Sequence, residues 1–143
     1  MQLATAEPNI IIGKEEHLLQ KENKMSLTFE QIISAWSKCS NDKDPSEIEA
    51  LLSSDFVWQS AAPDHKTPSD DKANKQETIE FTLGAGIRIS DFNTIYNGDE
   101  VVSGTHSAII DGEEKAVFCV GFLTDDGTKV RQWRHLTGNY PGA

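Results

Sequence analysis

Apolar residues in the C-terminal half of the chain alternate with polar ones or form short runs, the pattern typical of β-strands. Segments 101–110, 115–123 and 128–137 are rich in Val, Ile, Phe, Thr and Trp, which favour a pleated, half-buried surface. Another such segment, near 87–96, precedes the turn signal Asn97-Gly98. The pattern predicts an antiparallel sheet in which consecutive strands are joined by tight turns.

Two glycine-containing turns set the register of the last three strands. Asp111-Gly112 fits a two-residue type I′ turn, in which both residues need positive φ, and this turn places His106 opposite Val117. Asp125-Asp126-Gly127 fits a three-residue bulged loop with a left-handed glycine, and this loop places Val117 opposite His135. We therefore expect the two histidines on one face of the sheet, on either side of Val117.

The two faces of the predicted sheet differ in the size of their side chains. One face combines small residues with Trp and two His: Gly104, His106, Ala108, Val117, Cys119, Gly121, Trp133 and His135. The other face carries mostly large apolar residues: Val101, Ile109, Phe118, Val120, Phe122, Val130 and Leu136. Gln132 and Arg134 lie at its margin. Both faces are too apolar to be left in water. We expect a concavity over the first face, and packing or an oligomer surface on the second.

Upstream of the strands, the apolar residues follow helical spacing behind recognisable caps. Thr28 and Gln31 form a capping box for a first helix. The apolar positions of that helix are Phe29, Ile32, Ile33, Trp36 and Cys39. Asp44-Pro45 opens a second, short helix that runs through Leu52.

A third helix is predicted after a short strand and a loop. Residues 55–59 form the strand, and 61–73 is rich in Pro, Asp and Lys, which indicates a solvated loop. Asn74 and Glu77 cap the third helix, and glycines at 84 and 86 end it. Its apolar positions are Ile79, Phe81 and Leu83.

The length of the chain predicts the number of domains, and its charge excludes some kinds of binding partner. The 143 residues suit one domain, which we place at 25–143, behind a polar N-terminal appendage at 1–24 that is disordered or loosely helical. A formal net charge of −10 argues against nucleic acid or an anionic membrane as partner. The chain lacks an apolar run of membrane-spanning length and the features of a signal peptide, so we expect a cytoplasmic protein.

The order of elements, together with "AWSKCSNDKDPSEIEALLSSDFVW", "GDEVV" and the closing "DGTKV…W", resembles the nuclear transport factor 2-like superfamily. The resemblance covers about residues 26–138 and is nearest to SnoaL-like and ketosteroid-isomerase-like members. It implies an α+β fold of the cystatin-like type, in which a cone-shaped curved antiparallel sheet wraps around three N-terminal helices. It also implies an interior pocket and a homodimer joined through the outer sheet face.

Ketosteroid isomerases of this family bind an oxyanion with a tyrosine and a protonated aspartate, and they move the proton with a second aspartate. By resemblance, Trp36 stands at the tyrosine position and Ser60 at that of the base. The oxyanion aspartate falls on Cys119 or Val120, depending on where a one-residue gap is placed. None of these side chains does the same work, because indole does not titrate and serine is a poor base. The sequence thus argues against ketosteroid isomerisation by the carboxylate mechanism.

His106 and His135 are the candidate catalytic residues, since imidazole titrates near neutrality. The alternative for His106 is a neutral core histidine bonded to a neighbour, and for His135 a structural or solvent-facing side chain. A metal would need a third ligand. Asp91 supplies one if the Asn97-Gly98 loop has two residues, whereas a bulged loop turns Ser90 and Phe92 inward. We expect neither metal nor cofactor.

The candidate substrate-binding residues are mostly aromatic: Trp36, Trp58, Phe81, Cys119 and Trp133. Core packing is compatible with the same residues. Cys39 and Cys119 match no zinc or redox spacing, and we expect both to be buried free thiols. The predicted function is binding of a small hydrophobic molecule, with histidine acid/base chemistry of the lyase or isomerase type on a carbonyl or hydroxyl compound. The alternative is a non-catalytic dimerisation or protein-interaction module of the same fold.

Overall fold

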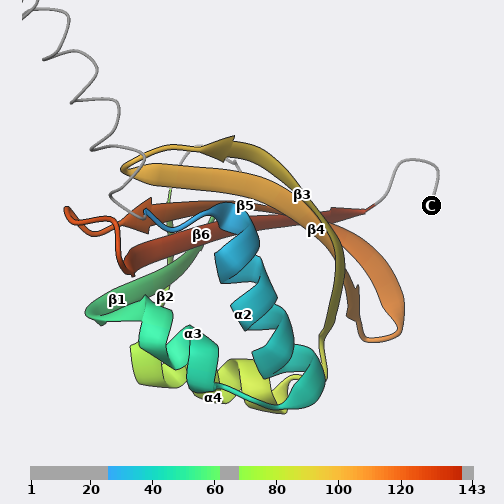
Figure 1. The fold of residues 1–143 in the computed structure, drawn as a ribbon. Coiled ribbons are helices and arrows are strands. Elements are labelled where there is room, and N and C mark those ends of the chain that lie inside the picture. Colours follow the sequence, from blue (N-terminus) through green and yellow to red (C-terminus); the bar gives the residue numbers. More distant parts are fainter. Residues whose placement is uncertain (1–25, 62–67, 140–143) are drawn as a thin grey trace, which may run out of the picture.

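The computed structural model describes residues 26–61 and 68–139. Within them lie the helices α2 (Phe29–Asp42), α3 (Ser46–Leu51) and α4 (Lys75–Gly84) and the strands β1 (Leu52–Ala61), β2 (Pro68–Asn74), β3 (Arg88–Asn97), β4 (Val101–Ile110), β5 (Glu113–Leu123) and β6 (Val130–Asn139). The strands form one curved sheet in the order β2-β1-β6-β5-β4-β3, with the helices in its concave side (Figure 1). The α+β prediction is confirmed. The sheet departs from a purely antiparallel one at β1 and β6, which pair in parallel.

The capping boxes of α2 and α4 are formed as predicted, whereas the N-cap of α3 is Pro45 and not Asp44. The Thr28 hydroxyl accepts the Gln31 N–H and the Gln31 side chain accepts the Thr28 N–H, so two N–H groups at the start of α2 are satisfied. Asn74 and Glu77 form the same box at α4. The second helix is shorter than predicted, because Leu52 already has extended backbone and begins β1.

The predicted loop at 61–73 is wrong at both ends, because Ala61 belongs to β1 and 68–73 belong to β2, which pairs with β1. Residues 62–67 lie outside the described residues. An edge strand is hydrogen-bonded on one side and keeps its polar side chains in water, so its composition resembles that of a loop. Proline is tolerated here because it is the first residue of the strand. Strand β1 is also longer than the predicted 55–59. The predicted appendage at 1–24 lies outside the described residues.

The first tight turn has the predicted geometry. Asp111 and Gly112 have φ of 53° and 80°, and His106 pairs with Val117. The second turn is longer than predicted, because the Thr124 N–H donates to the Lys129 carbonyl at 2.9 Å and so encloses four residues.

A bulge follows the second turn, at Arg131: Phe122 pairs with Gln132 while Leu123 pairs with Val130. The bulge and the extra loop residue move the register by two positions. His135 therefore lies opposite Cys119, and not opposite Val117 as predicted. A shift of two keeps every later side chain on its predicted face.

Val130 precedes the bulge and does not follow that rule. It is fully buried in the core, where the prediction placed it on the outer face. The outer-face prediction does hold for Ile109, Phe118 and Leu136, which are 41%, 42% and 36% exposed.

Strand β3 follows neither predicted register. Three residues separate Asn97 from β4, and bulges lie between Ser90 and Asn93 and between Thr94 and Tyr96. Asp91 and Phe92 are both exposed, and Asp91 has a left-handed φ of 47°. The third metal ligand considered from the sequence therefore points to solvent. The residues opposite β4's inner face are Ile89, paired with Ala108, and Thr94, paired with Gly104.

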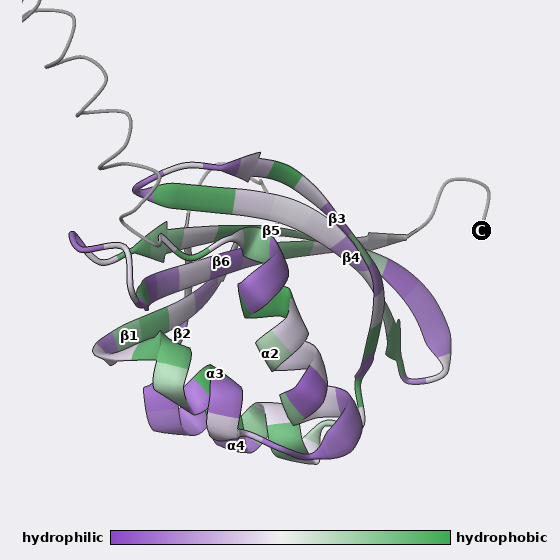
Figure 2. Cartoon of the chain, in the orientation of Figure 1, coloured by the Kyte–Doolittle hydropathy of each residue, from purple (hydrophilic) through white to green (hydrophobic). Residues whose placement is uncertain are grey.

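The core lies between α2 and the inner face of the sheet, and Figure 2 shows apolar residues on the helices and along the strands that surround it. Phe29, Ile32 and Cys39 of α2 are completely buried there, together with Val102 of β4. Among the described residues, none of the helices is both long and apolar enough to cross a membrane.

Candidate binding pocket

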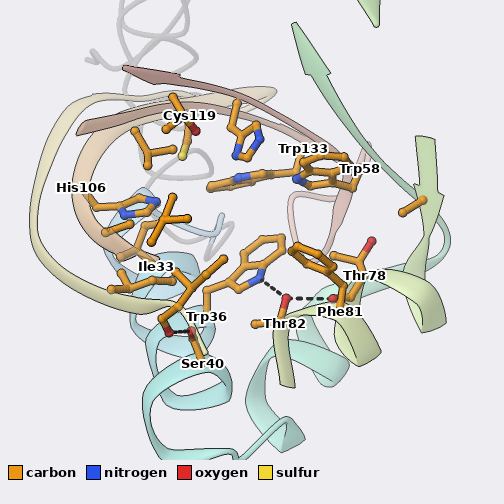
Figure 3. Close-up of a pocket in the computed structure, with 18 of the residues that line it drawn as sticks. Ile33, Trp36, Ser40, Trp58, Thr78, Phe81, Thr82, His106, Cys119 and Trp133 are labelled. Carbon is orange, nitrogen blue, oxygen red and sulfur yellow. Dashed lines mark hydrogen bonds between the residues drawn. The ribbon is translucent and has the colours of Figure 1, made fainter. Parts of the chain in front are cut away.

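A cavity of about 380 Å³ lies between the inner face of the sheet and helices α2 and α4 (Figure 3). The residues predicted for the site all contribute to its wall: Trp36, Trp58, Phe81, His106, Cys119, Trp133 and His135. Aliphatic side chains, among them Ile33, Ile89, Ala108 and Val117, supply most of the rest. Small-molecule sites have this size and this mostly apolar character.

Aromatic rings packed against one another form one side of the cavity. Trp36 of α2 and Trp133 of β6 have ring centroids 4.9 Å apart, and Trp133 also stacks on Phe29 at 6.0 Å. The Trp36 indole N–H donates to the Thr82 hydroxyl of α4 at 3.4 Å. These contacts hold the rings in place before any ligand arrives. Phe81 of α4 also lines the cavity, yet it is 67% exposed and so borders on solvent.

His106 is buried in the cavity wall, in the middle of β4. Its Nδ1 lies 3.0 Å from the Ser107 carbonyl oxygen. Burial lowers the pKa of His106 below the usual 6.5, and the hydrogen bond to Ser107 only partly offsets this. The ring is therefore neutral at pH 7.

His135 lies on β6, with β5 between it and the strand of His106. Its ring meets the edge of Trp58 at a centroid distance of 4.8 Å, in a T-shaped arrangement. Burial, and secondarily the nearby His106, lower the pKa of His135 to about 4. The cavity thus holds two neutral imidazoles at pH 7 in a mostly apolar wall.

Several solved structures share this architecture. A nuclear transport factor 2-like protein of unknown function from Cytophaga hutchinsonii superposes with a TM-score of 0.60 at 10% identity, covering 80% of this chain and 93% of that one. IdmH, a proposed polyketide cyclase from Streptomyces antibioticus, gives 0.55 at 13% identity, covering 74% and 88%. A proposed ketosteroid isomerase from Kribbella flavida gives 0.58 at 10% identity, covering 87% and 84%.

The chain has the nuclear transport factor 2-like fold. At these identities the likeness establishes the fold alone. No family model matches the sequence, and no curated protein matches it either.

The four residues that the resemblance places at the ketosteroid isomerase positions do not all face the cavity. Trp36 and Cys119 line the cavity, whereas Ser60 and Val120 are not in its wall. Among the described residues the one carboxylate in the wall is Glu77, and it accepts the Asn74 N–H at the start of α4 at 3.0 Å. Glu77 is exposed to solvent and caps the helix, so the imidazoles are the buried groups of the wall that can take up a proton.

Cys119 is an inert part of the wall. Burial raises the pKa of the thiol to about 12, so it stays protonated at neutral pH. Cys119 and Cys39 are both buried free thiols, as predicted. The described residues contain no group of three His, Cys, Asp or Glu able to hold a metal ion.

Hydroxyl groups on the helices also line the cavity, and the sequence analysis missed them. Thr78 and Thr82 of α4 donate to the carbonyls of Asn74 and Thr78, at 2.7 and 2.8 Å, and Ser40 of α2 donates to the Ile87 carbonyl. The spacing of Thr78 and Thr82, one helical turn apart, was the available signal.

The depressed pKa of His135 predicts a pH-dependent stability. In the unfolded chain the imidazole takes up a proton near pH 6.5, whereas in the folded protein it does so only near pH 4. Its contribution is therefore complete above pH 6.5, falls as the pH drops to 4, and then levels off, for a loss of about 3 kcal/mol. We expect urea unfolding at pH 7 and pH 4.5 to show a smaller loss in His135→Leu than in the parent protein. Equal losses in the two proteins would mean that His135 is solvated.

Proposed function

We propose that this chain binds a flat, mostly apolar carbonyl or hydroxyl compound in the cone, and that His106 and His135 move protons on it as in a SnoaL-like isomerase, lyase or cyclase. The observation that carries the proposal is the cavity of about 380 Å³ with two imidazoles in an aromatic wall. Both imidazoles are neutral at pH 7 and can accept a proton, and the pKa of about 4 makes His135 a weak base. The apolar surroundings favour a ligand with ring systems. That structurally similar proteins include a proposed polyketide cyclase and a proposed ketosteroid isomerase supports this class of chemistry.

A thermal-shift screen of bicyclic and tricyclic aromatic ketones and phenols tests the binding step. A ligand present at 100 times its Kd stabilises its host by about 2.7 kcal/mol, so binders are detected as a raised Tm. Each binder is then incubated with the protein, and its isomers or cleavage products are separated by chromatography. If no compound raises the Tm, the binding proposal fails.

The double variant His106→Gln with His135→Gln tests the chemistry. We expect turnover to be lost while the ligand still raises the Tm, because the aromatic wall is unchanged. Turnover that survives in the double variant would assign the chemistry to another group.

We also propose that the outer face of the sheet joins two copies of the chain. Phe118 and Leu136 are directly paired on β5 and β6, and both are exposed, as is Ile109 of β4. Beside them, the guanidinium groups of Arg131 and Arg134 lie 5.5 and 5.6 Å from the centre of the Phe122 ring. An apolar patch with a polar margin is typical of subunit interfaces, and it equally favours the alternative of a non-catalytic interaction module.

A charge placed in this patch should separate the subunits. We expect the parent protein to run at twice the chain mass in size-exclusion chromatography with light scattering, and Phe118→Asp to run as a monomer, because the carboxylate would be buried without a partner. Phe92→Asp is the matched control, since Phe92 is 45% exposed but lies on the edge strand β3. A monomeric parent protein, or a dimeric Phe118→Asp, would contradict this interface.

A further inference from the structure

We propose that the cavity selects ligands that carry a hydroxyl donor, such as a phenol or an enol, and that Nε2 of His106 is the acceptor that recognises this group. The inference rests on the proposed binding function and adds to it the polar group that the ligand must present. It concerns the orientation of one ring and the hydrogen bond that fixes it.

The Ser107 carbonyl determines which nitrogen of His106 carries the proton. A carbonyl oxygen can only accept a hydrogen bond, so the contact of 3.0 Å requires a proton on Nδ1. In a neutral imidazole the other nitrogen, Nε2, is then a lone-pair acceptor. His106 is neutral at pH 7 because its ring is buried.

Nε2 has no hydrogen-bond partner within the part of the chain that the structure describes. The His106 ring lies in the cavity wall (Figure 3), together with Ala108 of its own strand and with Val117, its partner on β5. Two other donors of the wall already have protein acceptors: Thr82 donates to the Thr78 carbonyl, and the Trp36 indole donates to Thr82.

An acceptor that faces the cavity and has no protein partner favours a ligand that supplies a donor. An apolar ligand of the same shape would displace water from Nε2 and leave it unpaired, which costs about 1–3 kcal/mol. A hydroxyl at this point donates to Nε2 and avoids that cost. His135 is less selective, because no protein carbonyl or other group in the described ranges fixes which of its two nitrogens is protonated.

Two naphthalenes that differ in one group test this selection. 2-Naphthol and 2-methylnaphthalene have nearly the same shape, but only the first can donate a hydrogen bond. We expect isothermal titration calorimetry at pH 7.5 to show 2-naphthol bound at least about tenfold more tightly. If transfer out of water were the only factor, 2-methylnaphthalene would bind more tightly than 2-naphthol, because it is the more apolar compound.

Two substitutions of His106 identify the acceptor. His106→Leu removes the ring with both of its nitrogens, and His106→Phe keeps a ring without either nitrogen. Both variants should bind the two probes within about threefold of each other, because the unpaired acceptor is gone. Thr105→Val changes a neighbouring residue of β4 that lies opposite Phe118 and does not line the cavity, and it should keep the tenfold preference.

The outcomes separate this inference from the proposal on which it rests. Equal binding of both probes by the parent protein overturns the selection by His106 and leaves the binding function intact. A preference that persists in both His106 variants assigns the acceptor to another group and overturns the inference as well. If neither probe binds, the proposed function fails together with the inference.

Discussion

Replacing Gly104 with alanine is expected to lower the free energy of unfolding by about 3 kcal/mol, the upper part of the range for overpacked cores. A Cβ at this position would lie 2.3 Å from Cε2 of Phe29 and 2.6 Å from the backbone oxygen of Asn93. The Phe29 ring is completely buried and stacks on Trp133, so it has little room to retreat. Urea unfolding of the variant at pH 7 measures the loss.

Gly138→Ala is the control for this prediction. Gly138 is also in a strand of the sheet, but a Cβ there meets no atom within 4 Å. We expect its stability to change by less than about 0.5 kcal/mol. The further change Phe29→Leu should recover part of the loss in Gly104→Ala, because it removes the ring carbons that clash. A Gly104→Ala protein as stable as the parent would mean that α2 does not pack closely on β4.

Filling the cavity with Val117→Phe is expected to weaken the binding of 2-naphthol by about a hundredfold, or about 3 kcal/mol. Val117 is buried between His106 on β4 and Thr137 on β6, and it lines the cavity. A phenyl group here occupies the volume that the ligand needs. Because the space is empty of protein atoms, we expect the Tm to stay the same or to rise.

The same substitution on the other face of β5 provides the control. Val120 belongs to the outer face, and Val120→Phe should leave the affinity for 2-naphthol unchanged. Calorimetry compares the three proteins directly. If Val117→Phe binds as tightly as the parent, or if Val120→Phe loses binding, the ligand does not occupy the cone.

The face on which each side chain lies was predictable, because a register error of an even number of residues leaves every side chain on the same face. Asp111-Gly112 carries a strong local turn signal, and it correctly paired His106 with Val117. The second turn was wrong by one residue, and the bulge at Arg131 added another. A bulge has no reliable local signal, because it depends on how the strand meets its neighbours. His135 and Trp133 follow both errors, which add up to a shift of two, and so they still face inward. Val130 precedes the bulge and carries only the first error, so its face was predicted wrongly.

The strand near 87–96 was predicted, but its register could not be, because α2 holds β3 through side chains distant in sequence. The Asn41 side chain accepts the Ile89 N–H at 2.9 Å and donates to the Ile89 carbonyl at 2.8 Å, as a neighbouring strand would. At the other end, the Asn97 side chain accepts the Phe29 N–H at 2.8 Å. The bonded residues are 48 and 68 positions apart in the sequence, so the pattern of residues within β3 cannot predict these bonds.

The candidate site also has a part that the sequence predicts and a part that it does not. Its aromatic members follow from which elements surround a cone, and Trp36, Trp58 and Trp133 all line the cavity. The hydrogen-bonding role of His106 depends on a backbone carbonyl, Ser107, whose distance only the folded structure supplies.

Intermolecular NOEs from bound 2-naphthol to the methyl groups of the protein test the central claim most directly, because the two faces of the sheet carry different methyls. The account predicts NOEs to Ile33, Ala108 and Val117, whose side chains line the cavity. NOEs to Ile109 and Leu136 on the outer face, with none to the cavity methyls, would contradict it.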